Sequence, residues 1–178
     1  MTPVTTTSPE RVYDPVHRVS MAFEREGDRL WVFTWLDPGG HLPEHFHPTL
    51  DERWEVLDGT AGVKVDGHWH ELTADDDAVL VARGVRHELR NSSGARAHLQ
   101  CEVLPAGALQ EFLTESAWAA REGLYNRRSL PTSLRGAGWI AAFALRHREE
   151  TVMCSPPPAL QRVLLPIVAR LAPTPRTA

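Results

Sequence analysis

The sequence predicts a mainly β fold, a small barrel or sandwich, followed by α-helices. Two observations lead to this prediction. Between residues 16 and 104, short apolar segments are separated by turn residues at the spacing of an all-β domain. After the Pro105-Ala106-Gly107 break, the apolar residues recur at helical spacing instead. We therefore expect two parts, a β domain over residues 16–104 and a helical extension over residues 105–178.

The β part is predicted from segments that each suit one short strand. These segments are 16–23, 30–36, 52–57, 60–65, 68–72, 78–81, 85–90 and 95–104. Between two of them lies Asp66-Gly67, a dipeptide that favours a type I′ hairpin turn. Residues 1–15 are rich in Thr and Pro and have no periodicity, so we expect a disordered N-terminal lead.

The helical part is predicted from apolar stripes at 109–120, from about 131 to 145, and at 160–171. Pro166 lies within the third stripe and should kink or end that helix. The first and third stripes are too apolar to stand alone in water. We expect them to pack on the barrel or across a subunit interface, which favours a homodimer; binding at a membrane surface is the alternative.

The charge balance argues against two classes of partner. Lys and Arg number 19 against 23 Asp and Glu, giving a net charge of −4. Nucleic acids and anionic membranes both require a basic face, so we expect neither as a partner. The two cysteines are too few for a disulfide framework, and the N-terminal segment lacks the apolar core of a secretory signal. These features favour a cytoplasmic protein.

Four side chains form a candidate metal-binding set. His45 and His47 are two residues apart, so in a strand both imidazoles point to one side. Glu52 opens the next predicted strand and can add an oxygen, while His87 lies on a later strand. Three imidazoles and one carboxylate suit a single divalent transition metal (Fe, Mn, Ni, Cu or Zn) and leave positions open for substrate or water.

This arrangement resembles the cupin superfamily over residues 16–104. The first cupin motif is matched at Gly39, His45, His47, Glu52 and Gly59, and the second at Gly84, His87 and Asn91. The second motif departs from the family at two turn-shaping positions, Asp76 and Ala82. The resemblance implies a double-stranded β-helix, also called a jelly-roll barrel, with His45, His47, Glu52 and His87 as metal ligands.

Two assignments around this set stay open. The motif tolerates three or four residues before its acid, so Asp51 is an alternative to Glu52; we prefer Glu52 because its distance to Gly59 and its longer side chain fit the family. A second His-x-His pair, His68 and His70, lies beside the hairpin turn, where a solvated edge is the simpler interpretation.

Four residues are candidates for a substrate pocket, and no catalytic residue is predicted. Trp54 lies two positions beyond Glu52 and should share its side of the strand. Phe33 and Trp35 share a face with each other, but the sequence does not say which face. His98 lies on a polar strip that faces either solvent or the barrel interior.

These residues favour a metalloenzyme that acts on a small organic molecule. Alternation points Glu44 away from the metal, so no protein base is evident and the metal must carry most of the chemistry. This argument, together with a likeness to the cupin dioxygenases, favours oxygenation. A redox-neutral cyclase, isomerase or decarboxylase is the alternative, and a non-enzymatic binding module is a third possibility.

Overall fold

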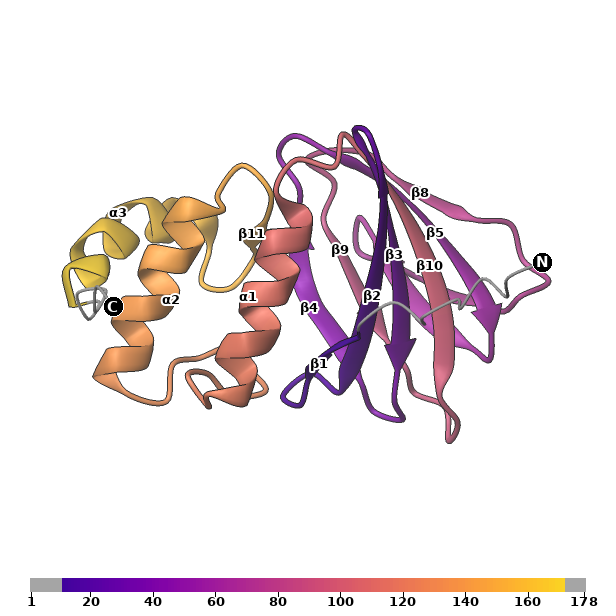
Figure 1. The fold of residues 1–178 in the computed structure, drawn as a ribbon, viewed down its shortest axis with the longest axis horizontal. Helices are drawn as coiled ribbons and strands as arrows, with labels where there is room; N and C mark the ends of the chain where they lie inside the picture. The colour runs from indigo at the N-terminus through magenta and orange to yellow at the C-terminus, as the bar shows by residue number, and fades with distance from the viewer. Residues whose placement is uncertain (1–10, 172–178) are drawn as a thin grey trace, which may run out of the picture.

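Two antiparallel sheets form the barrel in a computed structural model that describes residues 11–171 (Figure 1). The first sheet has the order β1-β2-β3-β10-β5-β8, and the second β11-β4-β9-β6-β7. Strands of the first sheet are β1 (Val12–Asp14), β2 (Val19–Glu26), β3 (Arg29–Leu36), β5 (Asp51–Asp58), β8 (Val79–Val81) and β10 (Ala97–Leu104). Strands of the second are β4 (His41–Phe46), β6 (Ala61–Val65), β7 (His68–Leu72), β9 (His87–Arg90) and β11 (Val152–Met153). The prediction of a mainly β, cupin-like barrel is confirmed.

The core lies between the two sheets and follows from strict alternation along the central strands. In β3, Leu30, Val32, Thr34 and Leu36 are buried, while the aromatic residues between them are half-buried. Strand β10 alternates in the same way and pairs with both β3 and β5. Because side chains of a strand point alternately to its two faces, each of these strands has one apolar inner face.

The hairpin between β6 and β7 has the turn that its sequence predicts. Asp66 and Gly67 have φ angles of 47° and 83°, and the flanking strands pair from Val65 and His68 outward. A type I′ turn requires positive φ at both central residues, which Gly adopts freely and Asp tolerates. The turn fixes the register of the hairpin.

The ends of the β domain differ from the prediction. Residues 1–10 lie outside the described part of the chain, but the disordered lead expected up to residue 15 is wrong for Val12–Asp14, which form β1 and pair with β2. Strand β11 comes from within the helical extension and adds to the edge of the second sheet beside β4 (Figure 1). Both strands are too short to leave a periodic signal, and each forms because a longer strand offers an open edge.

The helices lie on one side of the barrel (Figure 1). They are α1 (Leu109–Arg121), α2 (Leu134–Arg146) and α3 (Pro158–Val168), the last followed by a short 3₁₀ turn, η1 (Ala169–Leu171). Leu109 and Ala117 of α1 belong to the same buried cluster as the barrel strands, so α1 packs on the barrel. The Ser133 hydroxyl caps α2 by accepting a hydrogen bond from the N–H of Gly136.

Helix α3 does not bury the stripe predicted for it. Val163 and Ile167 are 63% and 57% exposed, and Gln161 is the buried residue of this helix. Pro166 lies inside α3, two residues before its end. The homodimer expected from the stripe stays a prediction.

Two further properties of the described residues bear on the expectations. No helix within residues 11–171 is long and apolar enough to cross a membrane. Cys101 and Cys154 are both free thiols.

Candidate metal centre and adjoining cavity

Three histidines from neighbouring strands of the second sheet converge at one point. His45 is near the end of β4 and pairs in register with His87, the first residue of β9. His47 lies just beyond β4, and its ring centroid is 4.9 Å from that of His45 and 5.0 Å from that of His87. One ring nitrogen from each of the three histidines lies within 4.8 Å of the others. The sequence prediction that these three imidazoles meet is therefore matched by their geometry.

The backbone orients each of these rings through its Nδ1 atom. Nδ1 lies 2.7 Å from the carbonyl oxygen of Pro43 in His45, 2.6 Å from that of Glu150 in His47, and 3.1 Å from that of Val85 in His87. A carbonyl can only accept, so each Nδ1 donates and, in the neutral ring, each Nε2 keeps a lone pair. The Nε2 atoms of His47 and His87 are buried, and Glu52 lies beside both. Such a set of buried, inward-facing nitrogens fits a divalent transition metal.

Glu52 lies against two of the three histidines. Its carboxylate oxygens are 3.1 Å from Nε2 of His47 and 3.0 Å from Nε2 of His87. The indole N–H of Trp54 donates to the same carboxylate at 2.8 Å. Burial alone would raise the pKa of Glu52, but the two imidazoles outweigh it and hold the pKa well below the usual value. An ionised carboxylate held in this position can complete a four-residue ligand set.

Asp51, the alternative to Glu52, points elsewhere. Its carboxylate accepts hydrogen bonds from the guanidinium and the backbone N–H of Arg83 at an exposed position. Adjacent residues of a strand face opposite sides of the sheet, so only one of the two acids can reach the histidines. The geometry favours Glu52, and its role as a ligand is part of the proposal below.

The pKa values of the histidines reflect their mutual approach. Burial, followed by the charges of His87 and His47, holds the pKa of His45 well below its usual value. Burial also lowers the pKa of His47, but the Glu52 carboxylate outweighs this effect and the net pKa is raised. A metal ion requires neutral imidazoles, so metal binding and protonation compete at this site.

The motif residues around the site act through the backbone. Gly84 has a φ of 79° and donates its N–H to the carbonyl oxygen of His47 at 2.8 Å, which holds the loop that carries this histidine. Asp76, where the family usually has a glycine, accepts hydrogen bonds from both the backbone N–H and the hydroxyl of Thr73. The departure from the motif at this position therefore still makes a closed turn.

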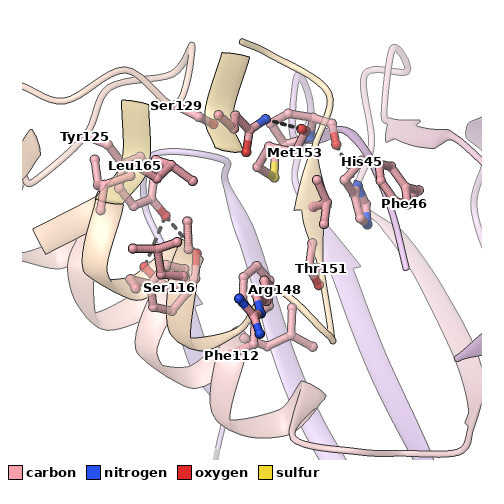
Figure 2. A pocket seen from close by; sticks show the side chains of 18 of the residues that line it. His45, Phe46, Phe112, Ser116, Tyr125, Ser129, Arg148, Thr151, Met153 and Leu165 are labelled. Carbon is pink, nitrogen blue, oxygen red and sulfur yellow. Dashed lines mark hydrogen bonds between the residues drawn. The ribbon is translucent and has the colours of Figure 1, made fainter. Parts of the chain in front are cut away.

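A cavity of about 670 Å³ opens beside His45, between the barrel and the helices (Figure 2). Its apolar walls include Phe112, Trp139, Phe143, Met153 and Leu165. These five residues lie on α1, α2, β11 and α3, whereas residues of β2 and β4 form the barrel side of the cavity. The sequence prediction missed these helical residues, because nothing local links positions so far apart; the only signal was the apolar stripe on each helix.

None of the four predicted pocket residues lines this cavity. Phe33 and Trp35 are on the outer face of β3, opposite the buried Leu30 and Val32, and their assignment to a substrate pocket stays a prediction. His98 is also on the outer face, where its ring stacks on Trp35 with centroids 4.5 Å apart. Alternation defines two faces but not which is inward, and the bulky aromatic residues occupy the outer one. Trp54 does face the metal site, through its contact with Glu52.

The other expectations about polar residues agree with the structure. Glu44 points away from the histidine cluster and pairs with Lys64. His68 and His70 lie on the exposed strand β7.

Comparison with known proteins finds similarity over part of the barrel. Residues 32–103 match the family model described as "Cupin domain". The tetracenomycin polyketide synthase protein TcmJ of Streptomyces glaucescens is 33% identical over 77 residues, which cover 43% of this chain and 51% of the relative. Polyketide synthase CurC of Streptomyces cyaneus is 30% identical over 70 residues, 39% of this chain and 45% of the relative. The chain thus spans about half the length of these relatives.

A solved structure supports the fold. The sugar phosphate isomerase from a cupin superfamily of Silicibacter pomeroyi is similar with a TM-score of 0.50 and 18% identity. The match covers 55% of this chain and 71% of that chain. At this level of identity the likeness concerns the fold alone.

Proposed function

We propose that this protein is a mononuclear metalloenzyme acting on a small organic molecule of polyketide type. The match of residues 32–103 to the cupin domain supports this proposal. One observation carries the proposal. Three imidazoles with Nε2 lone pairs meet beside a large apolar cavity, and His45 is both a member of the cluster and part of the cavity wall. A molecule in the cavity therefore comes next to the candidate metal ligands.

The proposed ligands are His45, His47, His87 and Glu52. The three histidines are oriented by backbone carbonyls, and Glu52 is held by Trp54. Fixing the second nitrogen of a ligating imidazole sets its tautomer and increases metal affinity. A divalent metal held by these groups supplies Lewis acidity, or redox chemistry if the metal is redox-active.

The cavity favours a largely apolar substrate of moderate size. Its volume of about 670 Å³ falls within the range of sites for drug-sized molecules. Phe112, Trp139 and Phe143 supply flat apolar surfaces, on which an aromatic or conjugated ring can lie. Both curated relatives are named as polyketide synthase proteins, which supports a polycarbonyl or aromatic polyketide as the substrate class.

The favoured reaction is a redox-neutral ring closure or isomerisation of such a molecule. Carbonyl-rich chains lose a proton between two carbonyls most easily when the developing oxyanion is stabilised, which is Lewis-acid chemistry. In this role the apolar walls would exclude water, and His45 is the residue of the histidine cluster that also lines the cavity. The relatives named as polyketide synthase proteins support this class.

Oxygenation is the second candidate. The observation in its favour is the donor set itself, three imidazoles and one carboxylate, which also suits a redox-active metal with open positions. The two candidates differ in whether turnover consumes O₂.

Metal content and ligand binding test the proposal directly. Protein purified without added metal should contain about one equivalent of a first-row transition metal by elemental analysis. A stable aromatic polyketide analogue, 1,8-dihydroxyanthraquinone, should bind by calorimetry, and Leu165→Trp, which narrows the cavity, should weaken that binding without changing metal content. Absence of metal together with absence of binding would overturn the proposal.

A further inference from the structure

A second chain of polar groups lies on the wall of the same cavity, apart from the candidate metal ligands. Asp14, His17 and Ser129 all line it, and Ser129 is labelled in Figure 2. Oδ2 of Asp14 is 2.8 Å from Nδ1 of His17, and Nε2 of His17 is 3.3 Å from the hydroxyl oxygen of Ser129. The order carboxylate, imidazole, hydroxyl matches the roles in a serine nucleophile triad.

Hydrogen bonds to both oxygens hold the Asp14 carboxylate in a fixed position. It is 3% exposed, and Oδ1 accepts hydrogen bonds from the backbone N–H groups of Val16 and His17. Oδ2 accepts from the Tyr125 hydroxyl at 3.0 Å as well as from the His17 ring. Burial raises the pKa of Asp14, but the interactions with His17 outweigh it, and the net pKa is lowered. The carboxylate is therefore ionised and can only accept.

This arrangement fixes the tautomer of His17. The ionised Asp14 carboxylate can only accept a hydrogen bond from Nδ1 of His17. The neutral ring therefore carries its proton on Nδ1 and presents the lone pair of Nε2 to Ser129. The ring is packed between Tyr125, stacked at 5.5 Å between centroids, and His41, edge-on at 5.0 Å. His17 can thus accept a proton from the serine hydroxyl without moving.

Ser129 occupies a strained position in a tight turn. Its φ is 56°, a left-handed conformation that is unfavourable for a residue with a side chain. Its N–H donates to the carbonyl oxygen of Asn126 at 2.7 Å, and the side chain is half-buried at the cavity wall. Strain of this kind often occurs at functional residues, because it holds a side chain in an exposed, fixed direction.

We propose that Ser129, His17 and Asp14 form a second catalytic site, independent of the metal, that takes an acyl group from an ester or thioester with an apolar acyl chain. The Ser129 oxygen attacks the acyl carbonyl carbon while its proton passes to Nε2 of His17. The bond to the leaving thiol or alcohol breaks, and His17 returns the proton to that group. Water, activated by His17, then cleaves the acyl-serine and releases the carboxylic acid.

The surroundings determine the substrate class and the expected rate. The acyl chain would lie along Phe112, Phe143 and Leu165, which excludes strongly charged acyl groups. The Ser129 N–H is already used within its turn, so it does not stabilise an oxyanion. Because acylation and release of the acyl-serine both pass through an oxyanion, we expect both steps to be slow, and covalent labelling is a sharper readout than turnover.

An alkyl fluorophosphonate and decanoyl-N-acetylcysteamine, a simple thioester, test the proposal on the full chain. Mass spectrometry should locate one adduct of each on Ser129. Ser129→Ala and Ser129→Gly should abolish labelling, and the glycine variant relieves rather than adds strain at this φ. His17→Asn, which retains a donor to Asp14, should slow labelling by about 100-fold or more, as expected for loss of a general base.

Ser116→Ala is the matched control. Ser116 also lines the cavity, but its hydroxyl contacts the Tyr125 hydroxyl at 3.1 Å and not His17, so this variant should label at the wild-type rate. Labelling should also persist after the metal is removed with a chelator, which separates this site from the proposed metalloenzyme function. No adduct on folded wild-type protein, or an adduct on a residue other than Ser129, would overturn the proposal.

Discussion

The Nδ1 atom of His47 lies 2.6 Å from the backbone carbonyl oxygen of Glu150, a residue 103 positions later in the chain. The Thr151 hydroxyl is 3.3 Å from the same nitrogen, and β11 then pairs its Met153 with His45 of β4. The helical extension therefore orients one histidine of the candidate metal centre and borders another. It is part of the site and not only a cover for the barrel.

This contact predicts that removing the extension affects the metal as well as stability. A chain that ends after Gly107 loses the core residues Leu109 and Ala117 together with the carbonyl partner of His47. We expect aggregation or a clear loss of stability and, in any soluble fraction, a metal affinity about 10–100-fold lower. Thermal unfolding and metal titration measure the two effects.

A chain that ends after Met153 is the control for that experiment. It keeps α1, the Glu150 carbonyl and β11 but lacks α3, which forms one wall of the cavity. We expect wild-type metal affinity and weakened binding of 1,8-dihydroxyanthraquinone. Equal metal affinity in both truncated chains would contradict the role of Glu150.

Substitution of the clustered histidines should remove the metal. His47→Ala and His87→Ala each delete a buried Nε2 atom that faces the cluster, so bound metal should fall to a small fraction of the wild-type content. Glu52→Gln should lower the affinity for the metal. Asp51→Asn should not lower it, because Asp51 pairs with Arg83 at the surface. Elemental analysis of the purified variants is the measurement.

His70→Ala provides the matched control for this series. His70 belongs to a second His-x-His pair, but it lies on the exposed strand β7. Its replacement should leave the metal content unchanged. A loss of metal in this variant equal to that in His47→Ala would count against the assignment of the cluster.

The histidine cluster could be predicted from the sequence in part for a local reason. The spacing of His45 and His47 is a property of one short segment, whereas His87 joins them through the long-range pairing of β9 with β4, which the resemblance to the two cupin motifs implies. The Asp66-Gly67 turn is also predictable from a short segment, because Asp and Gly are residue types that adopt positive φ angles.

The cavity could not be predicted, because its walls depend on tertiary packing. Phe112 and Phe143 stack with centroids 5.0 Å apart although they belong to different helices, and no sequence period links them. The face of β3 that carries Phe33 and Trp35 was undetermined for a related reason: alternation is symmetric, and only packing against the opposite sheet decides which side is inside. The Asp14–His17 pair was missed because Asp14 was assigned to a disordered lead.

Asp14 should make stability depend on pH in the acid range. The pKa of Asp14 in the folded protein is below its ordinary value of 3.8, so its contribution to stability is fully present above pH 3.8 and is lost as the pH falls through the folded pKa. Asp14→Asn should reduce the free energy of unfolding by about 1–3 kcal/mol at pH 7, since it removes a buried charged acceptor. The difference between wild type and variant should shrink below pH 3.8.

Urea unfolding at a series of pH values measures this dependence. Asp66→Asn, in the exposed hairpin turn where Asn also fits, controls for the loss of one surface carboxylate. A stability difference for Asp14→Asn that stays constant from neutral to strongly acidic pH would show that the carboxylate charge is not what the His17 and Tyr125 contacts stabilise.

The dependence of turnover on O₂ distinguishes a redox-neutral reaction from oxygenation. If the enzyme closes or isomerises a polycarbonyl chain, the metal acts through its charge, and turnover of a polyketide-type substrate should proceed at the same rate under nitrogen and in air. Protein stripped of metal and reloaded with Zn²⁺, which has no redox chemistry, should retain activity. Leu165→Trp should raise KM more than it lowers kcat, because Leu165 borders the cavity and is not in the histidine cluster. An oxygen electrode that records stoichiometric uptake, with no turnover by the Zn²⁺ form, would instead assign the protein to the oxygenases.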